Sequence, residues 1–164
     1  MIVIKRVAAE DVSVYRELRL RALADSPTSF SATYAREAQL TEEEWRKRTT
    51  RCDGVRIVGF LAFEGDRGCG MVFCFRDEQD DAVGTIVSMW VDPAVRRASV
   101  GRLLIDSILD WAKDRGMREL KLMVTSVNGG AIAFYERIGF RMSGKTGPYP
   151  NDPAITEFEM TLAF

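Results

Sequence analysis

The chain has 164 residues, of which 46% are hydrophobic and 29% are charged, and its formal net charge at neutral pH is -1. This composition predicts one globular domain over residues 1–164, and the near-zero charge argues against nucleic acid as a main partner. No apolar run reaches the roughly 20 residues of a membrane helix, and the N-terminus is unlike a signal peptide, so we expect a cytoplasmic protein without a membrane partner.

The chain contains no histidine and three cysteines. The lack of histidine excludes catalysis by Ser-His-Asp or Cys-His arrangements and removes the commonest metal ligand. An odd number of cysteines without a CxxC pair favours free thiols in a reducing compartment. We therefore expect neither a metal site nor a disulfide framework.

Predicted helices and strands follow one another from the first residues onward, with no linker or internal repeat between them. Apolar and polar residues alternate over residues 2–7, which predicts a strand. Over residues 9–27 the apolar residues recur at helical spacing, and Ser26-Pro27 ends this predicted helix. Residues 29–51 predict a turn, a short helical piece and a second helix. Thr41 and Glu44 fit a capping box at the start of that second helix.

Three β segments occupy the middle of the chain. Residues 55–65 and 68–78 predict two strands that are joined by a hairpin-like turn. Residues 81–93 predict a third strand, which ends at Asp92-Pro93.

The C-terminal third alternates helices and strands. Residues 99–115 form the longest amphipathic pattern, and a Gly ends it. A strand at 118–126, a helix that begins at Asn128, and two strands at 140–150 and 154–164 follow. The order β-αα-βββ-α-β-α-ββ predicts a mixed α+β layered sheet.

The segment "VRRASVG", residues 95–101, has two interpretations. Two arginines and a spacer before Ser99 are what a basophilic kinase prefers in a substrate. A basic turn of small residues that opens a helix also suits a ligand phosphate, because the first helix amides lack partners and the helix dipole is positive there. Solvated arginines beside an N-cap serine are the simpler structural alternative.

The same segment resembles the acetyl-CoA signature Q/R-x-x-G-x-G/A of the GNAT acetyltransferases. Arg96 and Gly101 match that signature, whereas Ser99 stands where the family usually has glycine. The segment "VSMWVDPAVRR" is similar to the family's central strand. The segment "NGGAIAFYERIGF" is similar to a second family motif, and the matching residues are Asn128, Ala131, Tyr135, Gly139 and Phe140.

The resemblance covers nearly the whole chain and implies a mixed, mostly antiparallel sheet of about seven strands flanked by four helices. It also implies an acetyl-CoA-dependent N-acetyltransferase that acts on a primary amine of a small molecule or a protein, and a possible homodimer. The implied residues for acetyl-CoA are Met89, Trp90, Val91, Arg96, Arg97, Ala98, Ser99, Val100, Gly101, Arg102, Asn128 and Tyr135.

Tyr135 is the general acid that the resemblance implies, since a phenol stays protonated at neutral pH. Its spacing alone would equally suit packing with Ile132 and Phe134, and Asn128 would also suit a helix N-cap. The usual basic glutamate of the family is replaced by Thr85. Either ordered water or another acidic residue then takes the proton, and the candidates are Glu64, Glu78, Asp81, Glu157 and Glu159.

Two loops would select the acceptor if the family pattern holds, namely residues 26–38 and 144–155. In the second loop, Tyr149, Asn151 and Asp152 either face an amine or form a proline-stiffened turn. Two further functions remain open: a non-catalytic acyl-CoA-binding or sensing module with the same fold, and a binder regulated by phosphorylation of Ser99.

Overall fold

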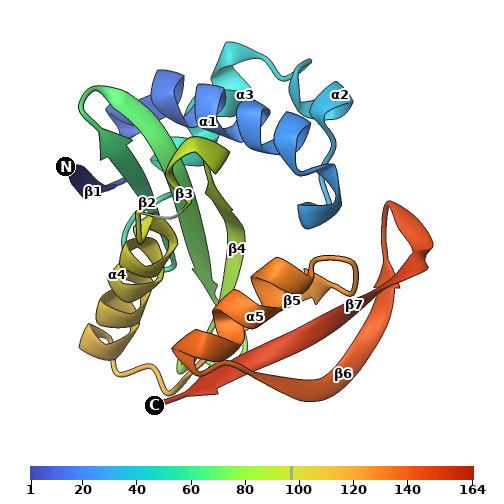
Figure 1. Ribbon diagram of the computed structural model, residues 1–164. Coiled ribbons are helices and arrows are strands. Elements are labelled where there is room, and N and C mark those ends of the chain that lie inside the picture. Colours follow the sequence, from blue (N-terminus) through green and yellow to red (C-terminus); the bar gives the residue numbers. More distant parts are fainter. Residues whose placement is uncertain (97) are drawn as a thin grey trace.

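The computed structural model describes residues 1–96 and 98–164 (Figure 1). The strands are β1 (Ile2–Arg6), β2 (Ile57–Glu64), β3 (Arg67–Arg76), β4 (Val83–Val91), β5 (Glu119–Thr125), β6 (Arg141–Tyr149) and β7 (Asp152–Ala163). The helices are α1 (Val12–Asp25), α2 (Tyr34–Glu37), α3 (Glu42–Thr50), α4 (Val100–Asp114) and α5 (Gly129–Ile138). Short 3-10 turns are η1 (Ala9–Asp11), η2 (Pro27–Ser29) and η3 (Pro93–Val95).

Local sequence signals account for where several helices begin. The Thr41 hydroxyl accepts a hydrogen bond from the Glu44 amide, and the Glu44 carboxylate accepts one from the Thr41 amide, so the predicted capping box is confirmed. At the start of α5, the Asn128 side chain accepts a hydrogen bond from the Ala131 amide. The described residues contain five α-helices rather than the expected four, because the short piece α2 is one complete helical turn.

The seven strands form one sheet in the order β1-β2-β3-β4-β5-β7-β6. Every neighbouring pair is antiparallel except β4 and β5, which are parallel. The predicted mixed, mostly antiparallel sheet is therefore confirmed. The parallel pair needs a crossover connection, and α4 provides it.

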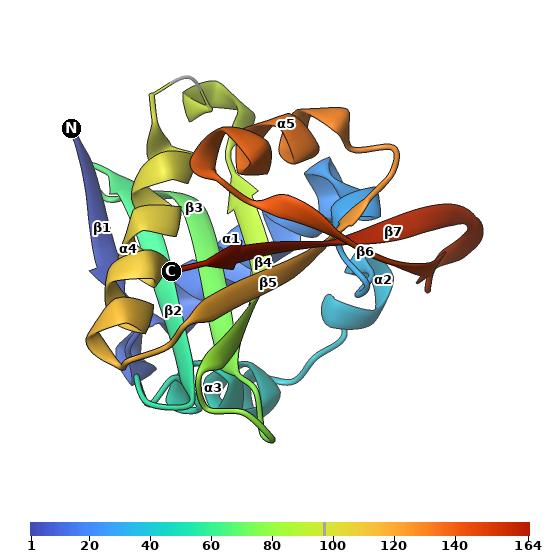
Figure 2. The ribbon, with the colours of Figure 1, turned by 90° about the horizontal axis from the view of Figure 1, so that it is seen from below.

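Helices cover both faces of the sheet, with α4 and α5 on one side and α1 to α3 on the other (Figures 1 and 2). The amphipathic face of α4 buries Leu104, Ile105 and Ile108 against the first side. Leu18 of α1 and Trp45 of α3 are fully buried on the second side. In the described part of the chain, no helix is long and apolar enough to cross a membrane.

Strands β4 and β5 separate after a short paired stretch. Their register covers only Val83 to Thr85 of β4, opposite Glu119 to Lys121 of β5. Further along, β4 carries an irregularity in its pairing with β3, and Ser88 has a left-handed φ of 55°. Since β5 no longer pairs with it there, the later half of β4 presents backbone groups to the space between the strands.

Candidate active site

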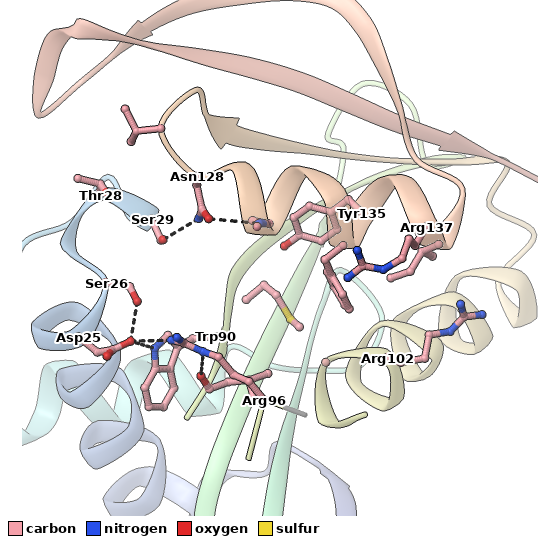
Figure 3. A pocket seen from close by; sticks show the side chains of 18 of the residues that line it. Asp25, Ser26, Thr28, Ser29, Trp90, Arg96, Arg102, Asn128, Tyr135 and Arg137 are labelled. Carbon is pink, nitrogen blue, oxygen red and sulfur yellow. Dashed lines mark hydrogen bonds and ion pairs between the residues drawn. The ribbon is translucent and has the colours of Figure 1, made fainter. Parts of the chain in front are cut away.

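A cavity of about 790 Å³ lies where β4 and β5 separate (Figure 3). Its wall is built from the end of α1 with η2, the end of β4, the start of α4 and the exposed side of α5. The residues that line it are Asp25, Ser26, Pro27, Thr28, Ser29, Met89, Trp90, Val91, Arg96, Ser99, Gly101, Arg102, Val127, Asn128, Gly130, Ala131, Phe134, Tyr135, Arg137 and Ile138.

Most residues that the sequence assigned to acetyl-CoA lie on this wall. The nine that do are Met89, Trp90, Val91, Arg96, Ser99, Gly101, Arg102, Asn128 and Tyr135. Ala98 does not line the cavity, and the Val100 side chain is fully buried in the core, so Val100 has only its backbone to offer a ligand. Arg97 lies outside the described residues.

The start of α4 is open toward this cavity. Ser99 precedes the helix with a left-handed φ of 61°, and its side chain makes no capping hydrogen bond. The capping role considered for the Ser99 hydroxyl is therefore not realised, and this hydroxyl does not occupy the first amides of α4. A Cβ on Gly101 would lie 3.1 Å from Phe134 and 3.3 Å from Met89, so glycine keeps α4 close to α5 and β4 here.

Among the described residues, three arginines line the cavity, and two of them have carboxylate partners. Nη2 of Arg96 donates to the Asp25 carboxylate at 2.7 Å, and Nε donates to the Val91 carbonyl at 3.0 Å. Arg102 donates to Asp106, one helical turn further along α4, at 2.9 Å. Arg137 makes no ion pair within the described residues. Its guanidinium is drawn between α5 and the start of α4 (Figure 3).

Asp25 connects α1 to both β4 and the turn before α4. Its Oδ2 atom accepts hydrogen bonds from Ser26 at 2.6 Å, from Trp90 Nε1 at 3.0 Å and from Arg96. These donors, Ser26 first, hold the pKa of the Asp25 carboxyl below its usual range. Asp25 carries no local sequence signal for this role, since an acidic residue before Ser-Pro resembles an ordinary helix end.

Tyr135 is buried, and its hydroxyl points into the cavity (Figure 3). Its ring packs edge-on against Phe134 and Phe140, with centroid separations of 5.2 and 5.6 Å. Burial raises the pKa of the phenol far above its usual value, so Tyr135 is neutral at physiological pH. The predicted packing role and a proton-donor role are compatible in this position.

A buried ion cluster supports β4 from the opposite face of the sheet. Arg19 donates to Glu37 at 2.8 Å and to the Ser88 hydroxyl at 2.7 Å, and Arg48 also donates to Glu37 at 2.8 Å. Burial opposes ionisation of Glu37, but the two guanidiniums outweigh it, and the pKa of Glu37 lies below its usual range. The cluster holds the left-handed residue of β4, and none of its members was expected from the sequence.

A second cavity of about 260 Å³ lies between the 26–38 loop and the β6–β7 hairpin, and shares Pro27 and Thr28 with the first. Tyr149, Asn151 and Asp152 line it. The Tyr149 hydroxyl donates to the Pro27 carbonyl at 3.0 Å and also to the Phe30 carbonyl, and Asn151 donates to the Phe30 carbonyl at 3.2 Å. Tyr149 and Asn151 thus anchor the hairpin to the loop, while their side chains form part of the cavity wall.

A family model describes most of this chain. Residues 18–140 match the model of the acetyltransferase (GNAT) family. The chain belongs to the GNAT acetyltransferase family. The matched region contains the end of β4, the start of α4 and Tyr135, and it includes every residue found to line the first cavity.

Individual GNAT relatives match shorter regions. An uncharacterised N-acetyltransferase of Methanocaldococcus jannaschii is 43% identical over 83 residues, which are 51% of this chain but only 34% of that protein. The ribosomal protein bS18-alanine N-acetyltransferase of Escherichia coli K12 is 31% identical over 117 residues, 69% of this chain and 75% of that enzyme. The chain thus spans well under two thirds of the M. jannaschii relative.

Solved GNAT structures share the whole fold. The PaiA N-acetyltransferase of Thermoplasma acidophilum, in complex with coenzyme A, superposes with a TM-score of 0.80. The superposition covers 100% of this chain and 99% of that one at 16% sequence identity. At this identity the likeness establishes the fold, and the predicted GNAT architecture is confirmed.

Proposed function

We propose that this chain, as one GNAT domain over residues 1–164, transfers an acetyl group from acetyl-CoA directly to a primary amine of a small molecule or a protein. The observation that carries the proposal is the first cavity, in which the later half of β4, the start of α4 and the Tyr135 hydroxyl meet. Family membership supports the same reaction, as does the relative in Escherichia coli that is named an N-acetyltransferase of the bS18 alanine.

The residues present fit a CoA thioester. The first amides of α4 have no side-chain cap at Ser99, so they are available to an anion at this helix end. Arg137 supplies a cation without an internal partner in the described structure. Backbone groups of Met89 to Val91 face the strand separation, where an amide-bearing arm finds hydrogen-bond partners.

Each catalytic task then falls to a named group. The bound thioester supplies an activated acyl carbon. Tyr135 provides the proton for the departing sulfur, since a neutral phenol in the cavity wall is a donor. Asn128 holds the start of α5, with its Nδ2 donating to Ser29 Oγ at 3.1 Å.

Two measurements on the purified protein test this function. We expect acetyl-CoA to raise the melting temperature, and we expect release of free CoA thiol with at least one member of a panel of small amines and peptide N-termini. Stabilisation by acetyl-CoA without transfer to any amine would support the acyl-CoA-binding module instead. No thermal shift with any acyl-CoA would contradict both functions.

A further inference from the structure

Glu157 lies on the sheet face opposite α4 and α5. Its register partner on β5 is Thr125, and its partner on β6 is Gly147. Two neighbouring pairs of opposed residues on these strands pack into the core under α4 and α5, namely Val124 with Phe158 and Leu122 with Met160. Because side chains alternate along strands, Thr125 and Glu157 project to the other face.

The surroundings of Glu157 contain an unsatisfied polar group and open space. The Thr125 hydroxyl is buried and has no hydrogen-bond partner in the described structure. At Gly147, an added Cβ would meet nothing within 4 Å. The position beside Gly147 is thus open next to the Glu157 carboxylate, whereas the Thr125 hydroxyl in the same row is enclosed and lacks a partner.

The same face leads to the second cavity. Ile155 lines that cavity and stands two residues before Glu157 on β7, so both project to one side of the strand. The η2 turn contacts β5 and contributes Pro27 to the walls of both cavities. Glu157 lines neither cavity itself, but it follows Ile155 of the second cavity wall along β7 and lies opposite Thr125, the last residue of β5.

The charge environment leaves the Glu157 carboxylate free to take a proton. In the described chain it has no ion-pair partner, and burial raises its pKa. On β5, β6 and β7, the alternation places four further charged side chains on this face: Glu119, Lys121, Arg141 and Glu159. Lys121 lies 3.9 Å from Asp77, and the Arg19–Glu37–Arg48 cluster of the same face lies under β4. Lys145 on β6 is exposed, and η2 brings no charged residue.

The other carboxylates that the sequence left open as proton acceptors are placed less well than Glu157 to take a proton from the amine. Glu78 and Asp81 belong to the connection between β3 and β4, at the end of β4 remote from Trp90, and Asp81 is paired with Arg56. Glu64 ends β2, which β3 separates from β4. Glu159 shares the face of Glu157 but lies one row further from the second cavity.

We propose that Glu157 is the general base for the acceptor amine, an inference that rests on the function proposed above. The amine loses one proton to the Glu157 carboxylate as its nitrogen forms a bond to the acetyl carbon. The carbon–sulfur bond of the thioester breaks, and Tyr135 gives its proton to the sulfur. Glu157 then releases its proton to water, and Tyr135 regains one from water, so the protons balance.

The test compares Glu157→Gln with the matched control Glu159→Gln, using an amine that the unmodified protein acetylates. We expect Glu157→Gln to lower kcat/KM for the amine about 100-fold near pH 7. The loss should shrink as pH rises and more amine is neutral in solution. The dissociation constant of acetyl-CoA and the melting temperature should stay unchanged, and Glu159→Gln should stay within about twofold of the unmodified protein. Glu157→Asp, which keeps a carboxylate, should recover part of the rate.

Several results would overturn the assignment. Full turnover in Glu157→Gln contradicts it, and so does an equal or larger loss in Glu159→Gln. A Glu157→Gln protein that no longer binds acetyl-CoA would indicate a structural role instead. If the unmodified protein binds acetyl-CoA but acetylates no amine, the proposed acetyltransferase function fails, and the proposed role of Glu157 as general base fails with it. If the unmodified protein is active and Glu157→Gln loses no activity, the assignment of Glu157 as general base is wrong, but the proposed acetyltransferase function stands.

Discussion

The guanidinium of Arg96 donates a hydrogen bond to the carboxylate of Asp25, 71 residues earlier in the chain, at 2.7 Å. This contact fastens the turn before α4 to the end of α1. The same carboxylate accepts from Trp90 Nε1, so one acidic side chain holds two sides of the cavity wall. Arg96 is therefore a structural part of the wall as well as a cation beside it.

Replacement of Asp25 separates its structural and electrostatic effects. Asp25→Ala leaves the buried Trp90 Nε1 without an acceptor and should lower the free energy of unfolding by about 1–3 kcal/mol. Asp25→Asn keeps an acceptor but removes the negative charge that pairs with Arg96 in the cavity wall, so acetyl-CoA should bind up to about fivefold more tightly at low salt. Denaturant titration and calorimetry at two salt concentrations measure these effects. Weaker binding in Asp25→Asn would contradict this role.

Arg137 is expected to attract the phosphates of CoA. Since its guanidinium has no carboxylate partner in the described structure, Arg137→Ala should raise the dissociation constant of acetyl-CoA about tenfold and reduce its dependence on salt. Arg141→Ala is the control, because Arg141 is exposed on β6 and does not line the cavity. Equal effects of the two substitutions in a binding titration would show that only net charge matters.

Ser99 has a backbone conformation that suits glycine. With φ at 61°, Ser99→Gly should raise the free energy of unfolding by up to about 1 kcal/mol, because glycine adopts this region without steric cost. Ser107→Gly, in the middle of α4, should lower it by about 0.5 kcal/mol. Thermal denaturation of both variants checks the pair, and a destabilised Ser99→Gly protein would mean that the serine side chain has a structural partner.

Most of the fold was predictable because each element is periodic over its own length. The alternation of apolar and polar residues marks the N-terminal strand, and amphipathic spacing marks α4. The capping box at Thr41 and Glu44 marks a helix start within four residues. The parallel pairing of β4 with β5, and its early end at Thr85, depends on contacts between distant segments. No local pattern encodes it.

The candidate site was predictable only where it coincides with family motifs. The turn before α4 and the segment from Asn128 to Tyr135 were found in this way, and both line the cavity. Asp25, Glu37 and Ser88 have no such signal, because their partners are fixed by tertiary structure. Val100 stands at an unspecified position of the signature and was assigned to acetyl-CoA with its neighbours, yet its side chain is fully buried in the core.

The Glu37 cluster predicts how stability depends on pH. The pKa of Glu37 is lower in the folded than in the unfolded chain, so its contribution is complete above about pH 5 and is lost as pH falls through the folded pKa. Glu37→Gln leaves Arg19 and Arg48 without their carboxylate and should cost about 3 kcal/mol near pH 7, with a smaller deficit at low pH. Exposed Glu42→Gln should change stability by less than about 0.5 kcal/mol. Urea titrations at several pH values measure this, and a pH-independent deficit would contradict it.

The most direct test of the proposed acetyltransferase is Tyr135→Phe, which removes one hydroxyl from the cavity and keeps the aromatic packing with Phe134 and Phe140. CoA-thiol release and acetyl-CoA affinity are measured on the same preparation. The account predicts that kcat falls about 100-fold while the dissociation constant of acetyl-CoA changes by less than about twofold. Unchanged turnover in Tyr135→Phe, with acetyl-CoA bound, would contradict it.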